Sequence, residues 1–187
     1  MRRTLLVVFC AVVGAAALSA RAQVAPAATK SGLSLSAGAL GSVFQPDYAG
    51  QVDENGVGLA QTAPNRLYGV GAYFDLRFNR WVTIEGEANW LHWNQYLGIN
   101  ENTYQIGPKV PIHTFHGWTP YGKVLVGLGN GSFISGTAGT LSFGGGVDYR
   151  LTRKLTLRVA DVEYQRWSMT PTLWPYGGSV GISYKIF

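Results

Sequence analysis

Apolar side chains recur at every second position along most of this 187-residue chain, and that spacing limits the folds it can adopt. In residues 68–78 the even-numbered positions hold Tyr, Val, Ala, Phe, Leu and Phe, whereas the odd-numbered positions hold Gly, Gly, Tyr, Asp and Arg. Residues 141–151 and 176–186 alternate in the same way. A β-strand turns successive side chains to opposite faces, whereas one face of a helix needs a repeat of about 3.6 residues. No comparable helical repeat follows residue 30, so the chain is predicted to be all-β.

We expect eight strands, separated by connections that alternate in length. The expected strands are residues 33–44, 68–78, 82–90, 102–112, 120–128, 141–151, 155–165 and 176–186. In the seventh, the apolar positions change phase between Val159 and Val162, which predicts a β-bulge near Ala160 and Asp161. Short connections at 79–80, 113–119 and 152–154 alternate with longer ones at 45–65, 94–101, 129–139 and 166–175. This alternation is typical of an up-and-down meander whose two ends face different compartments.

The distribution of charge between the two faces distinguishes a membrane barrel from a soluble β-sandwich. One face carries ionisable side chains among Gly and Ser, while the other is a band of Val, Leu, Ile, Phe, Tyr and Ala. Strands of about 9–11 residues cross a bilayer when tilted, and in lipid the sheet must close so that no backbone amide is left unpaired. We therefore predict an eight-stranded antiparallel up-and-down transmembrane β-barrel. A soluble sandwich with an aromatic core is the alternative.

The charged face is expected to line the lumen, because an eight-stranded barrel has room inside only for side chains. Buried charges need partners, so these groups should form ion pairs that plug the lumen. The expected lumen charge network is Asp75, Arg77, Glu85, Glu87, Lys123, Asp148, Arg150, Arg158, Asp161, Glu163 and Lys185. Opposite signs are about evenly supplied in this set. Glu85 and Glu87, which face the same way on one strand, could alternatively do acid–base work.

Aromatic residues gather at the ends of the expected strands, where a membrane barrel has its interfacial girdles. Their amphipathic rings suit the level of the lipid headgroups. The expected girdle is Phe78, Trp81, Trp90, Trp93, Tyr104, Trp118, Tyr149, Trp167, Trp174, Tyr176 and Tyr184.

The N-terminus has the layout of a secretory signal peptide. Two arginines precede an apolar run at residues 5–18, and the small residues Ala20 and Ala22 fit a cleavage site before Gln23. An uncleaved N-terminal anchor helix is the alternative.

Cleavage would divide the chain into a removed signal peptide at residues 1–22, a short segment at 23–30 and the barrel domain at 31–187. It removes three arginines and no acidic residue, so the formal net charge falls from +5 to +2. Nucleic acid is therefore not an expected partner. The sole cysteine, Cys10, leaves with the signal peptide, which excludes disulfide and thiol chemistry in the mature chain.

These features together resemble the OmpA/OmpX-like outer-membrane β-barrels of Gram-negative bacteria. The resemblance covers about residues 31–187 and is clearest at Val147–Thr152 and at the aromatic C-terminal segment Gly181–Phe187. It implies a location in the bacterial outer membrane, with outer-membrane lipid and the barrel-assembly machinery as partners. It also implies a C-terminal assembly signal, formed by Tyr184, Ile186 and Phe187. Phe187 is one residue out of the outward phase, which Ile186 holds.

No catalytic residue, cofactor or metal site is expected. His113 and His116 have a spacing that metals sometimes use, but no Cys or acidic residue accompanies them. A barrel enzyme that modifies lipid A would need a nucleophile set with a histidine and an acid. The deacylase type of such barrels has a histidine and a serine two residues apart on a late strand, and this chain has no such pair because no histidine follows His116. The glycines at 144–146 do not open a helix, so they form no phosphate cradle.

The expected function is non-enzymatic, with a structural or surface-interaction role and a largely plugged lumen. The long loops would meet a surface ligand that the sequence does not identify. The expected contact residues are Asp47, Tyr48, Asp53, Glu54, Trp167 and Trp174. A narrow porin-like channel for small solutes is the first alternative, and a lipid A-modifying enzyme is the second.

Overall fold

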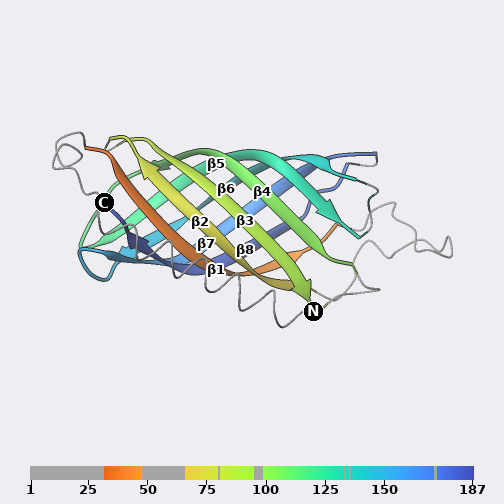
Figure 1. The fold of residues 1–187 in the computed structure, drawn as a ribbon, viewed down its shortest axis with the longest axis horizontal. Helices are drawn as coiled ribbons and strands as arrows, with labels where there is room; N and C mark the ends of the chain where they lie inside the picture. The colour runs from red at the N-terminus through yellow and green to blue at the C-terminus, as the bar shows by residue number, and fades with distance from the viewer. Residues whose placement is uncertain are drawn as a thin grey trace, which may run out of the picture. The chain divides into compact units, whose positions relative to one another are not determined.

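A computed structural model of the chain describes residues 32–47, 66–79, 81–94, 99–132, 134, 136–170 and 172–187. Eight strands close into one antiparallel barrel in sequence order, which confirms the predicted fold class (Figure 1). They are β1 (Ser34–Gln45), β2 (Leu67–Arg77), β3 (Thr83–Trp93), β4 (Glu101–Pro111), β5 (Trp118–Gly131), β6 (Ala138–Arg150), β7 (Leu155–Ser168) and β8 (Tyr176–Lys185). The first strand pairs with the last, from Ser36 opposite Lys185 to Gln45 opposite Tyr176, so the sheet has no free edge.

The barrel lies within one compact unit, Leu33–Phe187. The predicted signal peptide and the segment at 23–30 fall outside the described residues, and the domain boundaries stay predictions. Within the described ranges, no helix is long and apolar enough to cross a membrane.

The connection between β4 and β5 shows why one end of the barrel has tight turns. Phe115 and Trp118 exchange two backbone hydrogen bonds of 2.9 Å around His116 and Gly117. Both central residues have positive φ, 48° and 88°, as a two-residue hairpin turn of the primed type requires. His116 is thus a turn residue, with its side chain exposed to solvent.

The predicted bulge is present one residue before its expected position. Val147 of β6 pairs with Ala160, but the next residue, Asp148, pairs with Arg158, so Val159 is extra. The pairing of β7 with β8 likewise passes from Arg158 directly to Asp161. As a result, Arg158 and Asp161 both point into the lumen, 0% and 2% exposed.

The two faces of the sheet differ in polarity as the alternation predicts. Outward side chains in the middle of the strands are apolar and exposed, as at Val70, Ile106, Val126 and Val180. Inward positions are buried, and most of those in the middle of the barrel are polar or charged. A protein in water arranges polarity the other way round, so this arrangement suits a barrel surrounded by lipid.

Inward glycines make room for the largest rings in the narrow lumen. A Cβ at Gly129 would lie 2.7 Å from Cη2 of Trp167. A Cβ at Gly38 would collide with the backbone oxygen of Ile182 and would lie 2.7 Å from Cε1 of Tyr73. These contacts are shorter than van der Waals distance, so a larger residue at Gly129 would displace the Trp167 ring, and one at Gly38 would displace both the Tyr73 ring and the backbone of β8.

Candidate functional site

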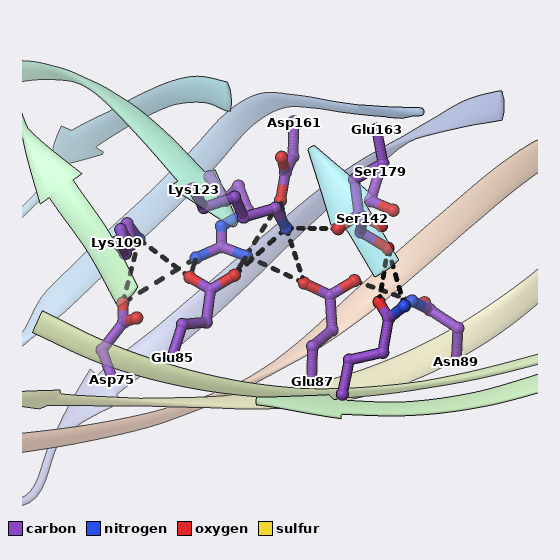
Figure 2. Close-up of polar contacts among 12 residues, drawn as sticks. Asp75, Glu85, Glu87, Asn89, Lys109, Lys123, Ser142, Asp161, Glu163 and Ser179 are labelled. Carbon is purple, nitrogen blue, oxygen red and sulfur yellow. Dashed lines mark hydrogen bonds and ion pairs between the residues drawn. The ribbon is translucent and has the colours of Figure 1, made fainter. Parts of the chain in front are cut away.

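The middle of the lumen holds a group of buried charges that we call the lumen cluster (Figure 2). Its three cations are Lys109 on β4, Lys123 on β5 and Arg158 on β7. Its six carboxylates are Asp75 on β2, Glu85 and Glu87 on β3, Asp148 on β6, and Asp161 and Glu163 on β7.

Lys123 lies where carboxylates from two opposite walls converge. Its Nζ is 3.1 Å from Glu85 and 2.7 Å from Glu87, both on β3. It is also 2.6 Å from Asp161 and 2.5 Å from Glu163, both on β7. The side chain of Lys123 is 0% exposed, so all of its charge is compensated by these contacts within the protein.

Arg158 crosses the lumen to Glu85. Its Nη1 donates to Glu85 Oε1 at 3.2 Å, and its Nη2 pairs with Glu85 Oε2, which gives a bidentate ion pair. Nη1 also donates to Asp161 at 3.1 Å. The guanidinium lies over the ring of Tyr73, with Cζ 3.9 Å from the ring centroid. These contacts fix the plane of the guanidinium across the barrel.

Lys109 completes the cluster towards the short turns. Its Nζ lies 3.1 Å from Asp75, 3.2 Å from Glu85 and 2.8 Å from Asp148. It also lies 4.0 Å from the centroid of the Tyr121 ring. One ammonium thus joins carboxylates of β2, β3 and β6.

Uncharged polar side chains continue the cluster towards the long loops. Asn89 donates to Glu87 at 2.7 Å and accepts from Ser42 at 2.8 Å. Gln105 donates to Ser142 at 2.6 Å and accepts from the same hydroxyl at 2.9 Å. These bonds connect strands across the lumen, so polar contacts extend beyond the ion pairs.

Two apolar groups at the long-loop ends of the strands form what we call the apolar cap. Phe44, Leu67 and Leu91 make one group, and Ala138, Trp167 and Leu173 make the other. Each of these side chains is no more than 6% exposed. The Trp167 indole donates to Gln165 at 3.0 Å, so its polar atom meets the polar lumen while its ring fills the cap.

The structure brings together eight of the eleven residues expected in the charge network. Arg77, Arg150 and Lys185 instead lie at the short-turn end with exposed side chains. Lys109 belongs to the cluster and was missed, although it has the phase opposite to outward Ile106 and Val110. The nearby prolines at 108 and 111 made that strand look irregular. The cluster therefore has six acids to three bases, rather than an even supply.

Ten of the eleven expected girdle aromatics have outer-surface positions, and one does not. The ring of Trp167 is 0% exposed inside the barrel, because it shares the inward phase of Glu163 and Gln165. Trp90 and Tyr104 are joined on the outside by a 3.0 Å hydrogen bond, and Tyr164 stacks on Trp174 with centroids 5.6 Å apart. The C-terminal residues Tyr184, Ile186 and Phe187 are all exposed. Their reading as an assembly signal stays a prediction.

The expected loop surface is described only in part. Tyr48, Asp53 and Glu54 lie outside the described residues. Asp47 accepts a 2.9 Å hydrogen bond from the backbone N–H of Trp174, which joins the first long connection to the last.

The lumen cluster offers one set of metal-type ligands. Oxygens of Glu85, Glu87 and Asp161 lie within 4.8 Å of one another, a spacing at which carboxylates can share a cation. Lys123 Nζ already contacts all three, so an ammonium takes the place of that cation. All three histidines of the chain are exposed and lie outside this cluster. The ionisable groups there are accordingly arranged as mutual partners.

The family profile described as "Outer membrane protein beta-barrel domain" matches residues 8–185 of the chain. No curated protein matches it at a significant level. Among solved structures, the Neisserial surface protein A (NspA) is similar at 17% identity, with a TM-score of 0.58, over 82% of this chain and 97% of that one.

Two further membrane barrels share the fold. The outer membrane protein OprG from Pseudomonas aeruginosa is 15% identical over 83% of this chain and 96% of that one, with a TM-score of 0.55. The outer membrane protein AlkL in lipid bilayers is 15% identical over 81% and 89%, with a TM-score of 0.50. At these identities the likeness concerns the fold alone.

Proposed function

The chain belongs to the outer membrane protein β-barrel domain family, and we propose that it is a non-enzymatic barrel with a closed lumen that presents its long loops for surface interactions. The bacterial outer membrane is its location. Outer-membrane lipid around the barrel and the assembly machinery during biogenesis are the partners that this proposal includes.

The contacts of Lys123 carry the proposal of a closed lumen. Its Nζ lies 2.5–3.1 Å from oxygens of four carboxylates on β3 and β7, which are opposite walls of the barrel. A conducting channel needs a continuous aqueous path, whereas the side chains that meet here are each no more than 3% exposed. The apolar cap adds a second obstruction nearer the long loops.

The arrangement of polar groups supports a non-enzymatic role. The described lumen hydroxyls of Ser42, Ser142 and Ser179 bond to amide side chains or to one another, and no histidine lies beside them as a base. Glu85 and Glu87, the candidate acid–base pair, are both engaged by Lys123. Activation of a serine nucleophile would need a neighbouring base.

A closed barrel with long connections at one end supports a surface role. The scaffold is held across its lumen by ion pairs, and binding residues generally lie on loops that a rigid scaffold positions. NspA, whose fold this barrel shares, is named as a surface protein, and the proposal extends that role to this chain.

Conductance in planar lipid bilayers tests the closed lumen. Chain folded in detergent and inserted into a bilayer should give no steady openings at low voltage. A gel shift between unheated and boiled samples serves as the control for folding. Large, steady openings would contradict the proposal and favour the alternative of a narrow channel for small solutes.

Thiol labelling of intact cells tests the surface role. Thr170→Cys, in the β7–β8 connection, should react with a membrane-impermeant maleimide, and Thr114→Cys, in the β4–β5 turn, should not. The chain's own Cys10 lies in the predicted signal peptide and would be removed with it. Equal labelling of both variants in intact cells, or labelling of Thr114→Cys alone, would contradict the proposed orientation.

A further inference from the structure

A polar cavity of about 210 Å³ lies at the short-turn end of the barrel, outside the lumen cluster. Its lining combines four cationic side chains, those of Arg77, Arg150, Arg153 and Lys185, with serine and threonine residues. Two carboxylates of the lumen cluster, Asp75 and Asp148, also border it. Drug-sized ligands occupy about 300–1,000 Å³, so this cavity suits a single small polar group.

Three of the cations are placed there by the strand alternation. Arg77 follows the inward residue Asp75 by two positions on β2, and Arg150 follows Asp148 in the same way on β6. Lys185 stands two residues after the buried Ser183 on β8. Each is therefore the last inward-phase residue of its strand, and the three converge on one mouth of the barrel.

Among the described residues, these four cations form no ion pair. In the part of the chain that the structure describes, every ion pair of the lumen involves Lys109, Lys123 or Arg158. The four mouth cations contact no carboxylate within those residues at ion-pair distance. Four like charges around one small cavity repel one another, which an anion between them would relieve.

The two bordering carboxylates only partly offset this charge. Lys109 Nζ lies 3.1 Å from Oδ2 of Asp75 and 2.8 Å from Oδ2 of Asp148. The two carboxylates supply two negative formal charges against the four positive charges of the mouth. Lys109, which also contacts Glu85, compensates part of that negative charge. The cavity therefore carries a net positive charge.

We propose that this cavity is a binding site for a phosphate group. Three guanidinium groups offer planar pairs of donors that match phosphate oxygens, and the surrounding hydroxyls supply further donors. The excess positive charge favours an anion, and inorganic phosphate and the phosphodiester of a lipid headgroup are both negatively charged at neutral pH. Thr114 and Thr119, whose hydroxyl oxygens lie 2.9 Å apart, sit on the rim and can donate to a bound oxygen.

The position of the mouth allows two sources of phosphate. Short turns of outer-membrane barrels face the periplasm, so the mouth opens beside the inner leaflet of the outer membrane. The phosphate could belong to a soluble periplasmic anion or to the headgroup of a phospholipid. The site lies outside the closed part of the lumen, so the proposal holds whether or not the barrel conducts.

Amide chemical shifts of the full chain in uncharged detergent test the site. Inorganic phosphate and a short-chain phosphatidylglycerol are titrated separately, and sodium chloride at matched ionic strength is the control for screening. Saturable shifts at Thr114, Thr119 and Ser36 with inorganic phosphate support the site and identify a soluble source. Saturable shifts with the phospholipid alone support the site and identify a headgroup.

Paired variants assign the binding to the mouth. Arg77→Gln and Arg150→Gln should each weaken binding by about tenfold, the effect of losing one charged hydrogen bond. Arg66→Gln, the same change before the first residue of β2 at the long-loop end, should leave the affinity unchanged, and the heat-dependent gel shift checks folding of all three. The proposal would be overturned if neither phosphate nor the phospholipid gave saturable shifts, or if sodium chloride gave equal shifts. An equal loss of binding affinity in Arg66→Gln would overturn it as well.

Discussion

Arg158 and Glu85 form a bidentate ion pair that spans the barrel, with both side chains 0% exposed. Arg158 is on β7 and Glu85 on β3, so three strands separate them in either direction around the sheet. The pair therefore joins opposite walls, which the hydrogen bonds of neighbouring strands cannot do. The bulge in β7 makes it possible, since it turns both Arg158 and Asp161 inward.

Arg158→Met should destabilise the barrel by about 3–5 kcal/mol, because it leaves buried Glu85 with one fewer partner. Urea unfolding in lipid vesicles, followed by tryptophan fluorescence, measures the change. Arg150→Met removes an exposed arginine from the barrel mouth and should stay within about 0.5 kcal/mol of the parent. Adding Glu85→Gln to Arg158→Met should cost less than the two single changes together. Full additivity would show that the pair does not couple the walls.

The lumen cluster and the apolar cap obstruct the lumen in series, so we expect neither single opening to create a channel. Lys123→Ala removes the ammonium that four carboxylates of β3 and β7 contact, and Trp167→Ala removes the largest ring of the cap. Each variant alone should remain closed in planar bilayers, whereas the double variant should show steady openings. A Lys123→Ala variant that conducts as well as the double variant would show that the cap contributes no barrier.

The two-residue alternation accounts for most of what the sequence could predict. It placed the strands to within a few residues and gave the inward phase of Glu85, Glu87 and Asp161, because side-chain direction in a strand follows from residue parity alone. The bulge was predictable for the same reason, since an extra residue shifts the parity.

The partners within the lumen were not predictable in this way. Parity shows that Arg158 and Glu85 point inward, but whether they meet depends on the stagger between strands in the closed barrel. Trp167 shows a different limit: its place near a strand end favoured an interfacial role, whereas its parity with Glu163 and Gln165 put it inside. Parity, which is fixed by backbone geometry, was the stronger signal.

Phe74 covers Gly86 on the outer face, and we expect that contact to appear as a coupling energy. The two residues are paired across β2 and β3, and a Cβ at Gly86 would collide with the Phe74 ring. Gly86→Ala should therefore lower stability by about 1 kcal/mol, the scale of an aromatic cross-strand pair. In a Phe74→Ala background the same change should be neutral or stabilising, because alanine in a strand loses less entropy than glycine. Equal effects in the two backgrounds would mean that the ring does not depend on the glycine.

Ile106 and Ile112 provide a matched test of the lipid-facing surface. Both side chains are exposed, but Ile106 lies in the middle of β4, whereas Ile112 follows its last residue at the short-turn end. Six residues of extended strand separate them by about 20 Å. In lipid vesicles, Ile106→Lys should lower the free energy of unfolding by about 2–4 kcal/mol, and Ile112→Lys by about 0–1 kcal/mol, because the cost of a lysine falls from the bilayer midplane to its interface. If water rather than lipid surrounded this face, both substitutions would be equally harmless, so equal small effects in vesicles would contradict the membrane-spanning arrangement.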